Sequence, residues 1–528
     1  MDHGRVSTDH RPGPGAPQRD IVEAFTDHVR RAPDRLAVTD GSVRLTYAQL
    51  DARSDAVAHA LARRRPESAE PRVALAMGRG HHYIGAVLGA AKAGWVCVPL
   101  DPRWPPARIR LLLRQARVRL LLHDERFDTG AHMGPELCRV QDLDIPTGTH
   151  EHPFTGSSSV PPEAALCVFY TSGSTGSPKG VVVTRRGVRA LAASCGPALG
   201  WTRPPRCLVI APNAFDASTF EIWTTLVNGG SCRVVPGLEL TFRNLREGLG
   251  DTDGADLVFL TTTLFNAVVD EEPEVLAGAR QIIVGGEQAS AAHIAALMRR
   301  HPHLDVVNAY GPTEATTFST FDRLPAPPST GGLVPIGTPL PHAEVRILDS
   351  GSAPVPDGEV GELCVVGDGL ARGYLDRPDL TAAAFVPDPT GEPGGRVYRT
   401  GDLGRRRADG TLECIGRLDS QVKIRGHRIE CDEVQHVLRG HPFVRDAVVA
   451  PRRSDGACVG LDAHVSVHPD RGPDAAAPAI TTWLRERLPE YMIPRVVVVA
   501  GLPRNHNGKI DRTLLDPRTA IHGHTADA

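Results

Sequence analysis

Residues 167–183 read CVFYTSGSTGSPKGVVV, a loop of small polar residues between two apolar runs. Its two ends are apolar runs rich in β-branched and aromatic residues, which is typical of buried strands. Between them, glycines allow tight turns that present backbone N–H groups, and Lys179 adds a positive charge. Hydroxyl donors come from Thr171, Ser172, Ser174 and Thr175. The pattern predicts a cradle for a polyanion, with a flexible Ser/Gly linker as the alternative.

Apolar segments of the same kind recur on both sides of this loop and alternate with helical stretches such as 82–93 and 104–117. Ile21, Phe25 and Val29 also have helical spacing. The alternation predicts an α/β architecture with mainly parallel sheets covered by helices, where ligands gather at the carboxyl ends of strands. The expected strands include PRVALAM (71–77), VCVPL (96–100), RLLLHD (119–124), RCLVIAP (206–212), LVFLTT (257–262), QIIVGG (281–286) and DVVNAY (305–310).

The length of 528 residues exceeds what one compact core normally holds, so we expect more than one domain. Between about 335 and 415, short hairpin-like strands predict a small antiparallel subdomain, and α/β texture returns after Asp419. We therefore divide the chain into a disordered N-terminus and tail, a large domain and a small C-terminal domain. Their limits are 1–18 for the N-terminus, 19–418 for the large domain, 419–516 for the small domain and 517–528 for the tail.

Composition excludes several classes of function. A net charge of −3, with 41% hydrophobic and 23% charged residues, gives no electrostatic reason to expect nucleic acid or an anionic membrane as a partner. Ten scattered cysteines without a C-x-x-C pair are typical of reduced thiols in a cytoplasmic protein. The sequence has no apolar run of about 18 residues and no signal peptide, so we expect a cytoplasmic protein without a membrane span.

Lysine is rare in this chain and stands at four positions only, although lysine and arginine together number 59. Such a bias keeps lysine where a compact ammonium group cannot be exchanged for a planar guanidinium group, and chance is the alternative. The four positions are Lys92, Lys179, Lys423 and Lys509. We expect Lys92 to serve helix capping or packing.

The loop at 170–180 is similar to the signature loop of the adenylate-forming (ANL) superfamily, which contains acyl-CoA synthetases, luciferases and the adenylation domains of nonribosomal peptide synthetases. It is not a Walker A loop, because G-x-x-x-x-G-K-[ST] is absent. Motifs that resemble the peptide-synthetase branch follow in order over residues 21–516. They are LTYAQL (45–50), KAGWVCVPLD (92–101), FDASTFEIW (215–223), NAYGPTEAT (308–316), GELCVVGDGLARGYL (361–375), YRTGDLGR (398–405), GRLDSQVKIRGHRIE (416–430), LPEYMIP (488–494) and NGKIDR (507–512).

The resemblance implies a large domain of two packed mixed or parallel sheets with a small β-barrel-like subdomain, and a small mobile α+β C-terminal domain. It also implies a ligase that joins a carboxylate to the α-phosphate of ATP, with Mg²⁺ as cofactor and release of pyrophosphate. Tyr310 would stack on adenine, Thr313 would touch the α-phosphate, and Asp402 would bind the ribose hydroxyls. The ATP-binding residues that the resemblance implies are Thr171, Ser172, Gly173, Ser174, Thr175, Gly176, Lys179, Gly286, Glu287, Asn308, Tyr310, Gly311, Thr313, Asp402 and Arg417.

The same resemblance assigns Glu314 to Mg²⁺ and makes Lys509 the catalytic residue, whose ammonium group would contact the carboxylate and the α-phosphate oxygen. Asp419 falls where the family has its hinge, about which the small domain would rotate after the adenylate forms. Rotation would turn Lys423 inward. Two departures from the family pattern are Arg185 in place of the common histidine and HNGK in place of PNGK before the catalytic lysine.

Family members that activate α-amino acids carry an aspartate in the FDAS segment that pairs with the substrate ammonium, and here it is Asp216. Carrying the remaining pocket positions over by motif gives an apolar lining that resembles pockets for valine, or for isoleucine or 2-aminobutyrate. The implied substrate-binding residues are Asp216, Ala217, Phe220, Leu260, Ile283, Gly285, Ala309, Thr317 and Phe318.

The activated residue would pass to the phosphopantetheine thiol of a separate peptidyl carrier protein in secondary-metabolite or antibiotic biosynthesis. Only 16 residues follow Arg512, too few for a carrier domain, so we expect a free-standing adenylation enzyme. The sequence leaves open whether a small MbtH-like helper protein is required.

Two other readings of the same residues stay open. An acyl- or aryl-CoA synthetase would activate an acid without an amine, and Asp216 argues against it. A degenerate nucleotide-binding module would lack catalysis, and the presence of Glu314, Asp402 and Lys509 argues against that.

Overall fold

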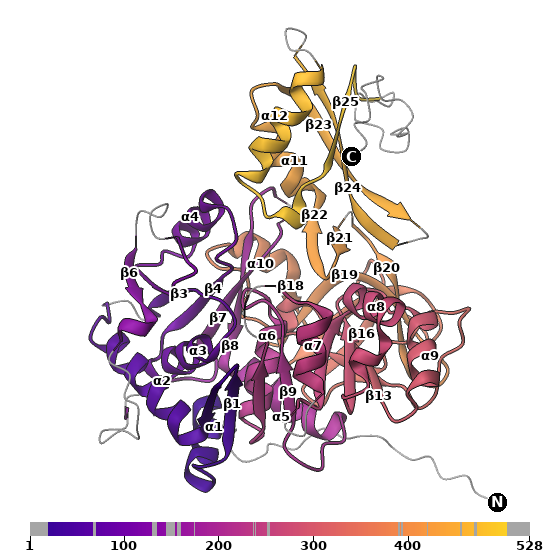
Figure 1. Cartoon of the computed structure of the whole chain (residues 1–528). Coiled ribbons are helices and arrows are strands. Elements are labelled where there is room, and N and C mark those ends of the chain that lie inside the picture. Colours follow the sequence, from indigo (N-terminus) through magenta and orange to yellow (C-terminus); the bar gives the residue numbers. More distant parts are fainter. Residues whose placement is uncertain are drawn as a thin grey trace, which may run out of the picture.

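A computed structural model describes most of the chain as a large domain with a smaller domain on top of it (Figure 1). None of the helices in this described part combines the length and apolarity that crossing a bilayer requires. Ser174 and Lys509 fall outside the described residues, so their predicted roles stay predictions. The described ranges are 20–66, 70–128, 135–143, 154–155, 160–173, 175–235, 237, 239–250, 254–388, 391, 394–419, 421–454, 457–468 and 473–503.

One sheet of the large domain has six strands, in the order β6-β5-β3-β4-β7-β8. All neighbours in it are parallel except β7 and β8, which form an antiparallel pair with Thr171 opposite Lys179. The two apolar runs of the opening stretch are therefore these two strands, and the donor-rich loop connects them. The bounds are β3 Arg72–Ala76, β4 Val96–Leu100, β5 Leu120–His123, β6 Glu136–Arg139, β7 Ala165–Thr171 and β8 Lys179–Thr184.

The second sheet has nine strands, in the order β15-β14-β13-β12-β11-β9-β10-β1-β2. Its central six strands, from β13 to β1, are parallel, and antiparallel strands close both edges. The bounds are β1 Leu36–Asp40, β2 Val43–Thr46, β9 Arg206–Val209, β10 Ser231–Val234, β11 Leu257–Thr261, β12 Gln281–Gly285, β13 Asp305–Tyr310, β14 Thr320–Arg323 and β15 Thr338–Pro339.

Helices cover these sheets, and polar residues fix where several of them begin. Asp20 and Thr46 cap α1 and α2, and the backbone N–H of each also donates to the side chain of the residue three positions later. The buried Lys92 joins α2 to α3, because its ammonium group lies 2.6 Å from Asp55 and also pairs with Asp51. The helices of the large domain are α1 Ile21–Arg31, α2 Tyr47–Ala62, α3 His81–Ala93, α4 Pro106–Gln115, α5 Arg185–Ala198, α6 Ala217–Thr219, α7 Phe242–Leu249, α8 Thr262–Glu271, α9 Ala291–Arg300 and α10 Pro378–Ala384.

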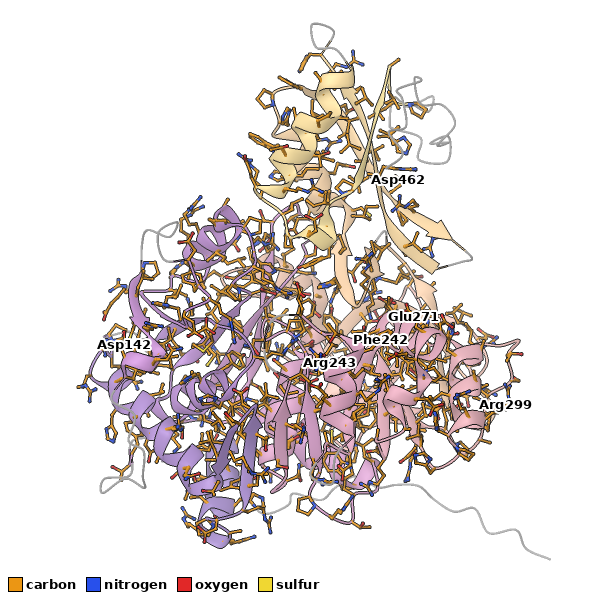
Figure 2. All side chains as sticks on the ribbon, viewed as in Figure 1. Asp142, Phe242, Arg243, Glu271, Arg299 and Asp462 are labelled. Carbon is orange, nitrogen blue, oxygen red and sulfur yellow. The ribbon has the colours of Figure 1, made fainter. Side chains whose placement is uncertain are left out.

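Figure 2 shows the side chains on this framework, with Arg299 at the edge of the view. Arg243 and Arg299 are both exposed. A third sheet of five antiparallel strands completes the large domain and forms the expected small β subdomain. Its strands are β16 Ala343–Leu348, β17 Gly361–Gly367, β18 Phe385–Pro387, β19 Arg396–Arg406 and β20 Leu412–Arg417.

The small domain has its own hydrophobic core, which includes Val434, Leu438 and Ile480. Its described residues form a two-stranded hairpin, a three-stranded sheet, two α-helices and a short 3-10 helix at Glu490–Met492. Asp419 lies between the last strand of the β subdomain and the first strand of the hairpin. The predicted fold class is confirmed, and the mobility of this domain stays a prediction. The elements are β21 Gln421–Ile424, β22 His427–Glu430, α11 Cys431–Arg439, β23 Val444–Ser454, β24 Ala457–Val467, α12 Pro473–Arg485 and β25 Arg495–Val499.

Candidate functional site

A cavity of about 720 Å³ lies at the carboxyl ends of the central strands of the nine-stranded sheet, where the small domain covers them. Thr261 at the end of β11, Gly286 after β12 and Tyr310 at the end of β13 all line it. Parallel strands place their carboxyl ends along one edge of a sheet, so segments far apart in sequence meet here. The cavity therefore occupies the position that the α/β architecture predicts for a ligand.

The donor-rich loop after β7 turns tightly beside this cavity. A side chain at Gly173 would place its Cβ 1.8 Å from the carbonyl oxygen of Ser177, so only glycine fits the turn. Gly176 has φ +82°, and a Cβ there would lie 2.6 Å from the side chain of His436 in α11. The loop glycines are thus required both by the turn and by the approach of the small domain.

Lys179 is buried at the base of this loop and lies over the ring of Tyr374, with its Nζ 4.9 Å from the ring centroid. Burial lowers the pKa of Lys179, Arg428 lowers it further, and Glu314 acts in the opposite direction. Its position opposite Thr171 in the β7–β8 register makes it part of the loop's rigid frame.

Glu314 lies in the turn after β13 and has no exposed surface. Its carboxylate accepts hydrogen bonds from the Tyr374 hydroxyl at 2.8 Å and from the Arg428 guanidinium at 2.8 Å. Burial alone would raise the pKa of this carboxyl, but Arg428, Lys179 and the bond from Tyr374 lower it to about 2. Glu314 is therefore an ionised carboxylate at neutral pH, with a cation beside it.

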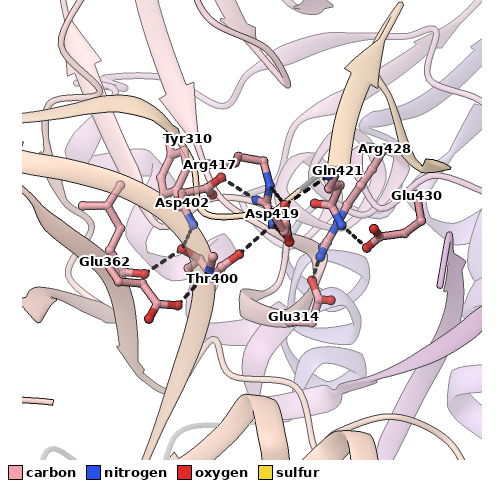
Figure 3. Close-up of polar contacts among 12 residues, drawn as sticks. Tyr310, Glu314, Glu362, Thr400, Asp402, Arg417, Asp419, Gln421, Arg428 and Glu430 are labelled. Carbon is pink, nitrogen blue, oxygen red and sulfur yellow. Dashed lines mark hydrogen bonds and ion pairs between the residues drawn. The ribbon is translucent and has the colours of Figure 1, made fainter. Parts of the chain in front are cut away.

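A second buried carboxylate, Asp402, lies on β19 and lines the cavity. It accepts a hydrogen bond from the Tyr310 hydroxyl at 2.7 Å and pairs with Arg417, which is its neighbour on β20. Arg417 also donates to both oxygens of Asp419 at 2.8 Å, as the dashed lines in Figure 3 show. The predicted ribose residue and the predicted hinge residue are thus joined through one guanidinium group.

The third carboxylate, Asp216, precedes the short helix α6, which continues as a π-helical turn over Phe220–Thr224. The Thr317 hydroxyl donates to the backbone oxygen of Asp216 at 3.1 Å and fixes the start of this helix. Burial raises the pKa of the Asp216 carboxyl, which the Thr313 side chain and Lys423 partly oppose. A carboxylate in this setting gains strongly from a further cation.

Aromatic rings close the cavity beyond Asp216. The ring of Phe318 packs edge-on against Phe220 at 5.3 Å and lies 5.4 Å from Phe259. Ala217, Ala309 and Thr317 line the cavity beside them. Phe220 and Ile283 lie behind this lining in the same cluster, and Gly285 allows β12 to approach Ala309 closely.

The structure does not bring Leu260 to the cavity. Successive residues of a strand point to opposite faces, and Leu260 packs in the core on the other face of the sheet, with Leu208 and Phe265. Phe259, one residue earlier on β11, lines the cavity instead. The prediction for Leu260 was therefore displaced by one residue along the strand.

The small domain contributes several contacts that the sequence analysis did not predict. Its hairpin β21–β22 enters the site, where Glu287 accepts a hydrogen bond from the backbone N–H of Gly426 and another from the Thr263 hydroxyl at 2.6 Å. Lys423 lines the cavity from the same hairpin. The last described strand, β25, lies at the top of Figure 1, away from the large domain.

Two further features were not predicted from the sequence. Thr316 and Thr317 have φ of +54° and +73°, a conformation that costs β-branched residues energy. Their hydroxyls hold it through bonds to the carbonyl oxygens of Gly369 and Asp216. Arg185, which replaces the family's common histidine, is buried and forms an ion pair with Asp20, so it attaches the start of α1 to α5.

Comparison with known proteins finds two family models that match this chain. The model of the family described as AMP-binding enzyme matches residues 25–375, and that of the AMP-binding enzyme C-terminal domain matches residues 433–509. A dimodular nonribosomal peptide synthase of Bacillus subtilis is 37% identical over 501 residues, which cover 94% of this chain and 21% of the synthase. Phosphinothricin tripeptide synthetase PhsC of Streptomyces viridochromogenes is 38% identical over 96% of this chain and 46% of its own length.

Among solved structures, holo-PA1221, described as an NRPS protein containing adenylation and PCP domains, superposes with a TM-score of 0.81 at 30% identity. The match covers 94% of this chain and 84% of that one. The chain thus spans less than half the length of the two peptide synthetases and most of the length of this solved structure.

Proposed function

Since this chain belongs to the AMP-binding enzyme family, as an adenylation domain of the nonribosomal peptide synthetase type, we propose that it activates a small aliphatic L-amino acid with ATP. A carboxylate oxygen of the amino acid attacks the α-phosphorus, the bond to the β-phosphate breaks, and pyrophosphate leaves. The product is an aminoacyl adenylate, a mixed anhydride.

The residues around the cavity fit a triphosphate that carries a divalent cation. The hydroxyl of Ser172, the amide of Gly173 and the ammonium of Lys179 are donors for phosphate oxygens, and the ionised Glu314 suits Mg²⁺. Mg²⁺ would neutralise charge on the phosphates as the α-phosphorus is attacked. Asp402 would accept from the ribose hydroxyls, and Tyr310 would stack on adenine. The remaining residues of the proposed nucleotide site are Thr171, Ser174, Thr175, Gly176, Gly286, Glu287, Asn308, Gly311, Thr313 and Arg417.

The single observation that carries the amino-acid assignment is the position of Asp216. It combines a raised carboxyl pKa with a place on the cavity wall, next to an aromatic floor. A substrate ammonium group would supply the counter-charge that this carboxylate needs, and an acid without an amine would leave it uncompensated. This favours amino acids over the aryl or fatty acids of the alternative reading.

The floor formed by Phe259 and Phe318, with Phe220 packed behind it, limits the side chain that fits beyond Asp216. We assign valine as the first substrate, followed by isoleucine and 2-aminobutyrate. One methylene group changes binding by about 1–3 kcal/mol, so discrimination among these three is modest.

In the second half-reaction, the thiol sulfur of a phosphopantetheine arm attacks the carbonyl carbon of the adenylate, and AMP leaves. We propose that the arm belongs to a separate peptidyl carrier protein, that Asp419 is the hinge between the half-reactions and that Lys509 assists the first one. Whether activity requires an MbtH-like helper protein is open, and an activity assay with the purified chain alone answers this question.

A pyrophosphate-exchange panel tests the proposal. It compares the twenty protein amino acids, 2-aminobutyrate and a few acids without an amine, with purified chain, ATP and Mg²⁺. We expect the highest rate with valine and none with isovalerate, which matches valine in shape but lacks the amine. Exchange with isovalerate and not with valine would contradict the assignment of Asp216 and favour an acyl-CoA synthetase.

A further inference from the structure

The recognition loop, residues 210–216, connects β9 to α6 and carries Asp216 to the cavity. Phe215 and Asp216, at its end, both line the cavity wall. A side chain on a loop is held only as precisely as the loop backbone is fixed. The contacts of this backbone therefore decide where the Asp216 carboxylate lies.

A buried carboxylate holds the first residues of the recognition loop. Glu221 has no exposed surface and lies in the π-helical turn that follows α6. Its carboxylate accepts the backbone N–H of Ile210 at 3.1 Å and that of Ala211 at 3.0 Å. Because Ile210 precedes Asp216 in the chain and Glu221 follows it, the carboxylate joins the two ends of the loop.

A buried guanidinium group holds the carbonyl group of the same residue. Arg79 lies between β3 and α3 and donates to the carbonyl oxygen of Ile210 at 2.6 Å and to that of Val235 at 3.2 Å. β3 belongs to the six-stranded sheet, whereas β9 and β10, which end just before Ile210 and Val235, belong to the nine-stranded sheet. Arg79 therefore fixes the start of the recognition loop to both sheets.

The same part of the large domain fixes the middle of the recognition loop. The side-chain amide of Asn213 donates to the carbonyl oxygen of Met77, just after β3, at 3.0 Å. The hydroxyl of Tyr83, in α3, donates to the carbonyl oxygen of Asn213 at 3.3 Å. With the bond from Thr317 to the Asp216 carbonyl oxygen, the loop backbone is held at its start, middle and end.

The charges of Glu221 and Arg79 are costly in this position. Burial raises the pKa of the Glu221 carboxyl to about 8, although its bonds from Ala211 and Ile210 and the charge of Arg79 act in the opposite direction. Burial also lowers the pKa of Arg79, which the charge of Glu221 opposes. Apolar side chains of similar size would fill this space without the cost of removing charges from water. The benefit of the two residues therefore lies in the backbone geometry that they fix.

We propose that Glu221 and Arg79 are positioning residues for the amino acid: they fix the peptide at Ile210, and through the recognition loop they set where the Asp216 carboxylate meets the substrate ammonium group. Both act through the loop, because the described residues that line the cavity include neither of them. The inference rests on the proposed function for the identity of the substrate.

Two conservative variants test this in the full chain. Glu221→Gln keeps the size of the side chain but replaces one acceptor oxygen with an NH2 group, which cannot accept from the loop amides. With Asp216 displaced, we expect KM for valine in pyrophosphate exchange to rise about tenfold, and KM for ATP and kcat at saturating valine to stay within about twofold. Arg79→Lys loses the fork that reaches two carbonyl groups and should raise KM for valine in the same way.

Asp256→Asn is the matched control. Asp256 is also a buried acidic residue, and it accepts the backbone N–H of Arg206 at 3.0 Å, at the opposite end of β9 from the recognition loop. Asp256→Asn should destabilise the chain but leave both KM values unchanged. The control separates the loss of a buried carboxylate beside β9 from a displacement of the recognition loop.

An unchanged KM for valine in both Glu221→Gln and Arg79→Lys would overturn the proposal. Equal rises of KM for valine and KM for ATP would also overturn it, because a general loosening of the fold produces them. Hydrogen exchange on the unmodified chain without ligand is a readout that needs no variant. The backbone N–H groups of Ile210 and Ala211 should exchange as slowly as that of Leu208 within β9, and rapid exchange at both would contradict the positioning role.

These readouts separate the two proposals. A chain that exchanges pyrophosphate with isovalerate and not with valine contradicts the proposed function, whatever the exchange rates at Ile210 and Ala211. A chain that activates valine with the same KM in every variant contradicts only the positioning role of Glu221 and Arg79.

Discussion

Phe259 and Leu260 are consecutive residues of β11 that face opposite sides of the nine-stranded sheet, and they offer a sharp test of the substrate pocket. Phe259→Ala removes part of the pocket floor, so preference should move from valine towards larger side chains such as leucine. We expect the ratio of kcat/KM for leucine over valine to rise by about tenfold or more, measured by pyrophosphate exchange.

Leu260→Ala is the matched control, since it truncates a side chain in the core on the face of the sheet that points away from the cavity. It should destabilise the chain by about 2–5 kcal/mol in urea unfolding and leave the substrate ratio unchanged. If Leu260→Ala alone changed the ratio of kcat/KM for leucine over valine, Leu260 and not Phe259 would be the pocket residue, as the sequence analysis predicted.

At this scale the structure brings predicted site residues together wherever a motif fixes the register. Asp216, Ala309 and Phe318 follow recognisable segments, and the structure places all three around one cavity. The segment TTTLFN departs from the family's commoner loop, so nothing in the sequence fixed which of two adjacent apolar residues faces the ligand. A one-residue displacement on a strand reverses the face. The left-handed Thr316 and Thr317 carry no sequence signal, because threonine rarely adopts that conformation.

The hairpin β21–β22 lines the site, and the burial of His427 in it predicts that the stability of the chain depends on pH. The imidazole stacks on Tyr491 at 3.6 Å and meets Phe215 of the large domain edge-on at 4.7 Å. Burial lowers the pKa of His427 to about 4, with Asp101 acting against this and Arg103 and Arg425 adding to it.

The unfolded chain, with an ordinary histidine pKa near 6.5, binds this proton more readily than the folded chain. The stability from His427 is therefore complete above pH 6.5 and is lost as the pH falls towards 4. At pH 5 the loss from this one group is at most about 2 kcal/mol. Urea unfolding at pH 7 and pH 5 should show a smaller pH effect in His427→Phe than in the unmodified chain. Equal pH effects in the two proteins would contradict the assignment.

Most elements were predictable because buried parallel strands form short β-branched runs in the sequence. The strands that lie within the expected segments include β3, β4, β5, β11, β12 and β13. The contact between Arg428 and Glu314 was not predictable in the same way. Each residue looks like an ordinary charge on a hairpin or in a turn, and the two lie 114 residues apart in the chain. Such contacts depend on how two domains meet, which local patterns do not encode.

At the scale of the whole molecule, the large and small domains have separate cores, and this predicts separate responses to core mutations. Leu438 of α11 is fully buried in the core of the small domain, and Leu276 is fully buried in the large one. Leu438→Ala should lower the free energy of unfolding of the small domain by about 2–5 kcal/mol, and with it the temperature of that domain's transition. The transition of the large domain should stay in place.

Leu276→Ala should do the reverse, and scanning calorimetry of both variants measures the two transitions. A single transition that moves equally in both variants would contradict the division of the chain near Asp419. The measurement therefore tests the predicted boundary between the large and the small domain.

The scarcity of lysine has a practical consequence for following domain movement. Of the three lysines in the described ranges, Lys92 and Lys179 are buried, while Lys423 is partly exposed on the wall of the cavity, on the hairpin that enters the site. An amine-acylating footprint read by mass spectrometry at this one residue therefore tracks the hairpin, with little labelling elsewhere on the described surface to obscure it.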